Sequence, residues 1–326
     1  NITTSKWGTA RNITIGNTTK TINGSENISW SLEEIGVSQV IKLVTTVAEL
    51  KSALVQGGRI HVKGGEYVLA ENEELEYYSN TELIGIGDVT IKVNPSSSGY
   101  IALKPHLNGT EGGYTGVHNF TMENINMDGQ AGTNNYGLFA TAHCKNIDIK
   151  NCTFKNYCGR WHLVEINSSQ NVKMTNCDIT DYNYNLDSTD MFCTEALQID
   201  FAGNQGNYPF TCNLDNTGCQ NITFESCNFE RIKTSWTGAV GSHTITADYM
   251  PRNVTFTRCT FTDVDNCIYA PDFKNLVCDT CTAKNVASFV IMHPSSNQNG
   301  TSCKIDNCEY DGWGRSKTIS YMNNTA

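Results

Sequence analysis

A short segment recurs along most of the chain, and this repeat limits the fold more than any other feature of the sequence. Each copy has an asparagine, an apolar residue, a polar or charged residue, a second apolar residue, two polar residues and, in most copies, a cysteine. The copies begin at Asn119, Asn146, Asn171, Asn221, Asn253 and Asn275, with a weaker copy from Cys303. Successive asparagines are 27, 25, 50, 32 and 22 residues apart. Such spacing is typical of a solenoid with one irregular coil per copy, and it predicts a large insertion after the third copy.

The residues inside each copy indicate β-strands. Apolar and polar residues alternate there, and successive side chains of a strand point to opposite faces. A second alternating segment follows the repeat, from His162, Glu195, Gly238 and Ser288 in four of the coils. A helical period of 3.6 and the LxxLxLxxN pattern of leucine-rich repeats are both missing. The sequence therefore predicts an all-β fold, a parallel β-helix whose coils stack about 4.8 Å apart.

The N-terminal part of the chain has a different pattern. Residues 47–54, VAELKSAL, have the apolar spacing of a short amphipathic helix and precede the strand-like GGRIHVKGGEYVL. Because the end of a solenoid exposes unpaired strand edges, we expect this helix to cap the N-terminal end. The predicted organisation is a small N-terminal segment over 1–37, a linker and cap helix over 38–57, and the β-helix over 58–326.

The 14 cysteines favour a buried ladder over a disulfide framework. A chain of 326 residues can bury a sufficient core without covalent cross-links. We therefore expect reduced thiols stacked inside the solenoid, with disulfides as the alternative. Six cysteines share one position of the repeat: Cys152, Cys177, Cys227, Cys259, Cys281 and Cys308.

Candidate metal ligands are few. Cys278 and Cys281 form a CxxC, but both fall in a repeat strand and no second CxxC exists, so no zinc site is predicted. Asp187 and Asp190 bring two carboxylates close together in the sequence LDSTD and could bind Ca²⁺, although two carboxylates in a loop are more often only solvated. No cofactor is predicted beyond this candidate.

Charge and hydropathy exclude some partners. The formal net charge is -10 and Lys and Arg residues form no cluster, which argues against nucleic acid. No apolar run approaches the roughly 18 residues of a membrane span, so membrane insertion is not expected. Charged residues make up only 17% of the chain, and a surface rich in Asn, Thr and Ser fits sugar hydroxyls. Because the chain begins at Asn1, we expect it to be a fragment of a longer protein.

Residues 46–93 contain the ELKSAL helix, a GGEY turn and SNTELIGIGDVTI. This run resembles the N-terminal part of the β-helix in the pectate-lyase-like superfamily. Together with the repeats, the resemblance covers most of the chain and implies a right-handed parallel β-helix. The superfamily includes lyases, hydrolases, esterases and proteins that only bind, so its fold does not select a reaction. The polygalacturonase pattern of Asn-Thr-Asp, Asp-Asp, Gly-His-Gly and Arg-x-Lys is missing, as is an evident arginine for the pectate-lyase mechanism.

Residues 7–37, WGTARNITIGNTTKTINGSENISWSLEEIGV, resemble a segment of tail-fibre proteins from phages and prophages. This resemblance implies a tail protein of the virion that acts at the host cell surface, forms a homotrimer and contacts other phage tail proteins through its N-terminus. The segment is too small to fold alone, as expected of a piece that pairs with copies of itself. The implied partner is a bacterial surface polysaccharide, which a depolymerase would cut and a non-catalytic adhesin would only hold.

Alternation along the second strands predicts a candidate site. If the apolar residues of these strands point inward, two outward columns form on successive coils: Glu165, Gln198 and Gly241, and beside them Asn167, Asp200 and His243. Glu165, Asp200 and His243 are the predicted catalytic residues, because two carboxylates and an imidazole can supply an acid and a base for glycosidic hydrolysis. The same face could instead catalyse β-elimination, with His243 as the base and Gln198 stabilising the enolate.

Polar residues on a solvated strand face are also ordinary, so the cluster alone does not separate an enzyme from an adhesin. A carboxylate pair in a walled groove would favour the enzyme, and a flat, open surface the adhesin. Residues 182–193 and 201–219 are long insertions that should rise beside this face as walls. The residues assigned to substrate binding are Gln198, Glu195 and His162 on the strands, and the aromatic residues Tyr184 and Trp236, whose rings could stack on sugars.

Overall fold

The structure is a computed structural model, and it divides the chain into two compact units, Asn1–Lys42 and Leu43–Ala326. In the first unit, β1 (Arg11–Ile15) and β2 (Thr18–Ile22) pair as an antiparallel hairpin. The residues described are 9–15, 18–24, 27–30, 41–132, 137–157, 162–183, 195–203, 210–234, 237–242, 249–271, 273–292, 302–316 and 320–321.

The predicted cap helix is confirmed as α1 (Val47–Gln56), which follows β3 (Lys42–Val44). Thr46 caps its N-terminus by accepting a hydrogen bond from the Glu49 amide, while the Glu49 carboxylate accepts from Thr45 N at 2.7 Å. The helix ends at Gly57, whose φ of 64° suits a residue without a side chain. Its apolar face packs on the core of the first coils through Leu50, Ala53 and Leu54.

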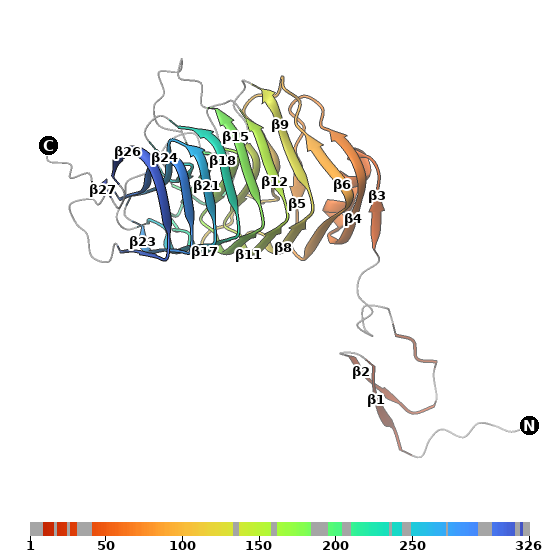
Figure 1. Ribbon diagram of the computed structural model, residues 1–326. Coiled ribbons are helices and arrows are strands. Elements are labelled where there is room, and N and C mark those ends of the chain that lie inside the picture. The colour runs from red at the N-terminus through yellow and green to blue at the C-terminus, as the bar shows by residue number, and fades with distance from the viewer. Residues whose placement is uncertain are drawn as a thin grey trace, which may run out of the picture. The chain divides into compact units, whose positions relative to one another are not determined.

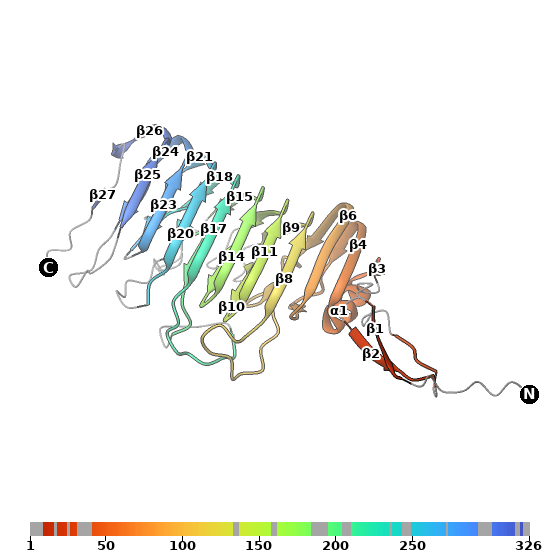
Figure 2. The same ribbon diagram turned by 90° about the horizontal axis from the view of Figure 1, so that it is seen from below.

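The remaining chain winds into coils whose strands form three parallel stacks (Figures 1 and 2). The first stack contains β8 (His118–Glu123), β11 (Lys145–Lys150), β14 (Gln170–Thr175), β17 (Gln220–Glu225), β20 (Arg252–Thr257), β23 (Lys274–Asp279) and β25 (Cys303–Asp306). The second contains β9 (Asn126–Gly132), β12 (Thr153–Tyr157), β15 (Asp178–Asn183), β18 (Asn228–Lys233), β21 (Thr260–Val264) and β26 (Glu309–Ser316). The third contains β5 (Leu75–Tyr77), β7 (Ile101–Pro105), β10 (Gly137–Ala142), β13 (Val164–Asn167), β16 (Leu197–Asp200), β19 (Val240–Gly241), β22 (Asn266–Ala270) and β27 (Ser320–Tyr321).

Three longer strands bend from one stack into the next. The strands β4 (Gly58–Val68) and β6 (Thr81–Lys92) pair with each other, and β6 then pairs with both β8 and β9. At the other end, β24 (Thr282–Met292) pairs with β21 of the second stack and β22 of the third. The structure thus has the right-handed parallel β-helix fold that the repeat and the first resemblance predicted.

The repeated asparagines form a ladder along the outside of the first stack. Each has φ between 55° and 62°, a left-handed conformation that asparagine tolerates better than most residues. Each side-chain amide donates to the side-chain oxygen of the asparagine one coil before, at 2.9 to 3.0 Å. The ladder runs through Asn80, Asn119, Asn146, Asn171, Asn221, Asn253 and Asn275. The first residue of the repeat is therefore fixed by the turn and by the stacking of coils.

Side chains of one type also stack inside the coils. Phe224 lies 4.7 Å from Phe256, and Phe229 lies 4.8 Å from Phe261, both measured between ring centroids. These distances match the spacing of neighbouring strands, so each aromatic residue packs on its equivalent in the next coil. Burial of these rings removes a large apolar surface from water and so stabilises the coils.

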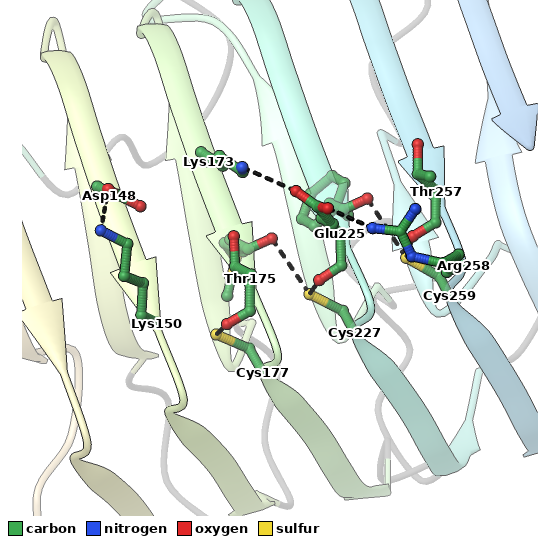
Figure 3. Close-up of polar contacts among 12 residues, drawn as sticks. Asp148, Lys150, Lys173, Thr175, Cys177, Glu225, Cys227, Thr257, Arg258 and Cys259 are labelled. Carbon is green, nitrogen blue, oxygen red and sulfur yellow. Dashed lines mark hydrogen bonds and ion pairs between the residues drawn. The ribbon is translucent and has the colours of Figure 1, made fainter.

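The repeat cysteines line the corner between the first and second stacks (Figure 3). Cys177 follows Asn176, which has φ of 51°, and its Sγ lies 3.4 Å from the carbonyl oxygen of Thr175 and 3.6 Å from that of Ile149. The neighbouring thiol of Cys227 and burial both raise the pKa of Cys177. All twelve cysteines in the described part of the chain are free thiols, as predicted, and the repeat cysteines are buried except for the half-buried Cys308.

The outer surface of the first stack is charged. Glu225 lies between two cations on neighbouring coils, Lys173 at 2.8 Å and the guanidinium of Arg258 (Figure 3). The two cations lower the pKa of Glu225 through their hydrogen bonds and charge, with Lys173 contributing most. Because the two cations are exposed and Glu225 is only half-buried, such pairs add little to stability. The face that concerns function is the third stack.

Candidate functional site

Strands β13, β16 and β19 of the third stack have the predicted register. Glu165 pairs with Gln198, Asn167 pairs with Asp200, and Gln198 pairs with Gly241. The residues between them point into the core, where Ile166 and Ile199 are fully buried. The two outward columns are therefore confirmed as far as the described residues extend.

The outward residues are buried, although the sequence alone allowed a solvated face. Glu165 is 6% exposed, Gln198 4%, Asp200 6% and Asn167 1%. Carboxylates are rarely buried to this extent unless hydrogen bonds or a ligand compensate for the water they lose. These residues of the third stack are thus shielded from solvent, and the face is not an open surface.

Asp200 is held in place by two hydrogen bonds to its carboxylate. The Gln198 side-chain amide donates to Oδ2 at 3.1 Å, and the backbone N–H of Phe201 donates to Oδ1 at 2.8 Å. Because each donor reaches a different oxygen, the two hydrogen bonds fix the orientation of the carboxylate. Gln198, which we predicted to bind substrate, therefore also orients the predicted catalytic aspartate.

A second group of buried residues lies just before the strands β13 and β16. His162 is 3% exposed and Glu195 is fully buried. The Nδ1 atom of His162 lies 2.6 Å from the backbone oxygen of Glu195, so this nitrogen carries a proton, and it is 3.9 Å from the Glu195 carboxylate. Burial, and then the charge of Glu195, raise the pKa of Tyr269 to about 12. His162 and Glu195 thus lie in the interior of the site, not at its edge.

Gly241 has no side chain, and this allows β22 to lie close to β19 at this point. A Cβ atom at this position would lie 2.1 Å from the backbone oxygen of Tyr269 and 3.1 Å from its Cβ. The residue must therefore be glycine for β19 and β22 to pair. The outer face beside Gln198 is then bordered by the ring of Tyr269.

Two loops cover the N-terminal side of this face (Figure 2). The loop between β7 and β8 and the connection between β16 and β17 are joined by the Asn213 N–H, which donates to Glu111 O at 2.8 Å, and by the Gly113 N–H, which donates to Asp215 at 2.6 Å. His143 is fully buried beneath them, with Nδ1 2.8 Å from Gly113 O and Nε2 2.9 Å from Asn213 O. These contacts confirm that the insertion after Asp200 rises beside the predicted face.

The two loops also enclose a small apolar cluster. Phe210, from the β16–β17 connection, packs with Ile101, Ala140 and Ala142 on the outside of β7 and β10. The residues next to Glu165 and Asn167 on the preceding coil are therefore alanines, since Ala140 pairs with Glu165 and Ala142 with Asn167. The polar site begins at β13 and extends toward β22.

Several predicted residues lie outside the described part of the chain: the catalytic candidate His243, the aromatic residues Tyr184 and Trp236, and the Ca²⁺ candidates Asp187 and Asp190. Their roles remain predictions. Within the described ranges, no three His, Cys, Asp or Glu side chains are arranged to hold a metal ion. None of the described helices is long and apolar enough to span a membrane.

Sequence reasoning gave no role to two residues of the site. Asn167 was placed in an outward column without a function, and Tyr269 was not considered. Tyr269 could have been found by aligning its strand, NCIYA, with the second strands of the other coils. The signal for Asn167 is its buried side chain, which the sequence pattern does not show.

The chain is a parallel β-helix with a buried polar face on its third stack. The solved structures similar to this chain include ORF18 of Geobacillus virus E2, at 12% identity and a TM-score of 0.50, covering 96% of this chain and 68% of that protein. The surface adhesin PfbA of Streptococcus pneumoniae is similar at 15% identity and a TM-score of 0.49, covering 84% and 89%. A polygalacturonase from Erwinia carotovora is similar at 13% identity and a TM-score of 0.45, covering 92% and 100%.

At this level of identity, the likeness to solved structures shows the fold alone. No protein-family model matches the sequence, and no curated protein matches it either. The function must therefore be argued from the site itself.

Proposed function

We propose that the covered face of β13 and β16 binds a bacterial surface polysaccharide and hydrolyses its glycosidic bonds. The observation that supports this most is the burial of Glu165 and Asp200 on two paired strands and of Glu195 just before the second strand, with the Gln198 side chain hydrogen-bonded to Asp200. Three carboxyl groups in so small a buried area are costly for stability. Such clusters of titratable groups occur most often where they do chemistry.

The separation of Glu165 and Asp200 suits an acid and base pair. They lie on adjacent strands and are offset by two residues, since Glu165 pairs with Gln198. From the spacing of strands and residues, their Cα atoms are roughly 8 Å apart. Inverting glycosidases hold their carboxyl groups roughly 6.5–9.5 Å apart to leave room for the attacking water, a separation that carboxyl groups on Cα atoms so spaced can reach. In this proposal Asp200, which accepts two hydrogen bonds, is the base, and Glu165 is the acid.

The charge of the site favours hydrolysis over β-elimination. The strands β13 and β16 carry the carboxylates of Glu165 and Asp200, and neither they nor β10 and β19 contain a lysine or arginine. A lyase needs a uronic acid, whose own carboxylate would be repelled by three acidic side chains unless a cation neutralised it. A neutral sugar has no such conflict, so we propose a neutral glycan as the substrate.

The biological setting that we propose is a phage tail protein acting at the host cell surface. It rests on the tail-fibre resemblance of residues 7–37. The homotrimer and the contacts with other tail proteins are proposed on the same ground, and the described hairpin supports them, since Ile13 and Ile15 are 37% and 40% exposed. Light scattering of the full chain should give three times the mass of 36.0 kDa; a monomer would refute the trimer.

The test of the enzyme is to incubate the protein with capsular polysaccharide, exopolysaccharide and teichoic acid purified from candidate host bacteria. New reducing ends without the absorbance of an unsaturated uronate are expected for the wild type. Asp200→Asn and Glu165→Gln should each lower turnover by about a hundredfold or more while glycan binding is nearly kept. Unchanged cleavage in both variants would place the site elsewhere. Binding by the wild type without any cleavage would show the adhesin instead.

A further inference from the structure

Asn167 has a buried donor that the protein does not use. Its side chain is 1% exposed, and its Nδ2 atom has no hydrogen-bond partner among the described residues. Leaving such a group unpaired destabilises a fold by about as much as a hydrogen bond contributes. A side chain kept at this cost is a candidate for contact with a ligand.

Asn167 lies between an apolar residue and a carboxylate on the neighbouring strands. On one side, it is paired with Ala142, whose methyl group offers no acceptor. On the other side it is paired with Asp200, whose carboxylate accepts from Gln198 and from the Phe201 N–H and has lone pairs left for a ligand. The backbone next to Asn167 is held as well, because the Ser169 hydroxyl donates to its carbonyl oxygen at 2.6 Å. The amide is therefore on a fixed strand, beside a fixed carboxylate.

We propose that Asn167 is a substrate-binding residue whose side-chain N–H donates to a hydroxyl oxygen of the sugar bound at Asp200. A hydroxyl group both accepts and donates, and the pair supplies one N–H donor beside one carboxylate acceptor. A carboxylate of the sugar would suit the donor but be repelled by Asp200. The pair thus recognises a neutral sugar hydroxyl, and this assignment rests on the proposed hydrolase or, without catalysis, on glycan binding alone.

Two substitutions remove the donor in different ways. Asn167→Ala deletes the amide, and Asn167→Asp keeps its shape but replaces the donor with an acceptor. We expect each to raise KM for the cleaved polysaccharide roughly 3- to 10-fold, as for the loss of one hydrogen bond, with a smaller change in kcat. The thermal midpoint of Asn167→Ala should stay equal to that of the wild type or rise, because an unpaired buried donor is gone. Asn167→Ser, which keeps a hydroxyl donor, should retain more of the affinity.

The matched control is Asn146→Ala in the exposed ladder, where the amide donates to Asn119. That variant should lose thermal stability and keep the wild-type KM. The opposite result for Asn167→Ala, a lower midpoint with unchanged KM, would assign Asn167 a structural role and overturn the proposal.

The polysaccharides used to test the proposed hydrolase also test the role of Asn167 separately from the hydrolase activity. If the wild type binds a glycan without cutting it, the hydrolase is refuted, and Asn167→Ala must still lower the measured affinity for that glycan roughly 3- to 10-fold. If the wild type cuts a glycan and both Asn167 variants match it in KM, only the role of Asn167 is refuted. A wild type that neither binds nor cuts any polysaccharide refutes both.

Discussion

Replacing Asn171 tests how the asparagine ladder holds the coils together. Asn171 has φ of 57°, donates to Asn146 at 2.9 Å and accepts from Asn221 at 2.9 Å. In Asn171→Ala the left-handed conformation costs about 1–2 kcal/mol, because the Cβ atom crowds the following carbonyl. Loss of two exposed hydrogen bonds adds about 1 kcal/mol. We therefore expect the free energy of unfolding to fall by about 2–3 kcal/mol.

The glycine variant separates the two contributions. Asn171→Gly loses the same hydrogen bonds but adopts a positive φ without strain, at an entropic cost of about 0.5–1 kcal/mol. It should therefore be less destabilising than Asn171→Ala by about 0.5–1 kcal/mol. Asn171→Asp keeps a residue that tolerates the conformation and can still accept from Asn221, but it places a carboxylate against the side-chain oxygen of Asn146. Its loss of stability should therefore come from that one contact and not from backbone strain.

The assay is chemical denaturation followed by circular dichroism, with equal slopes required before the free energies are compared. Asp178→Ala is the control, because Asp178 is exposed on β15 and does not have a positive φ. Its effect should stay within about 0.5 kcal/mol. A glycine variant that is as unstable as the alanine variant, or less stable, would refute the conformational explanation of the repeat.

Two further predictions concern the core and the loops. The native protein should react slowly with a thiol reagent, because burial raises the pKa of Cys144 to about 11 and of Cys219 to about 12. After unfolding without reductant, nearly all 14 cysteines should titrate as free thiols. Finding most of them in disulfides would contradict this prediction. Burial tends to raise the pKa of Asp215, but the N–H groups of Gly113 and Thr217, the Thr217 hydroxyl and the nearby His143 lower it below its ordinary value of 3.8. Its contribution to stability is thus present above that value and lost as the pH falls through the lower folded-state pKa, so Asp215→Asn should lower the thermal midpoint at pH 7 and have little effect near pH 2.

The repeat predicted the coils because each coil is built from residues close together in the sequence. The ladder asparagines, the corner cysteines and the alternating strands each recur once per coil, and the parallel pairing of equivalent residues follows from that recurrence. The same reasoning gave the register of Glu165 with Gln198 and of Asn167 with Asp200, since period two leaves one choice of face once the apolar residues point inward. The cap helix was evident for a similar reason, since its pattern changes from period two to 3.6.

The cover of the site was not predictable in the same way. His143 is bonded to Gly113 and Asn213, 30 and 70 residues away in the chain, and neither loop has a periodic pattern. The sequence indicated that insertions would rise beside the face, but not that the carboxylates would become buried. For His243, Tyr184 and Trp236 the position in the site remains a prediction, because they lie outside the described residues.

The placement of the insertions explains how one coil can carry a site without weakening the solenoid. The coil from Asn171 to Asn221 is 50 residues long, yet Asn221 still donates to Asn171 at 2.9 Å, as in the shorter coils. The added residues lie before and after β16, so the first and second stacks keep their regular pairing on both sides of it. The described residues of the second insertion lie beside the third stack, where Phe210 packs on Ala140 and Ala142, and Glu165 and Asp200 follow on the next strands. Rigid strands fix these side chains, while the loops around them can change in length and sequence.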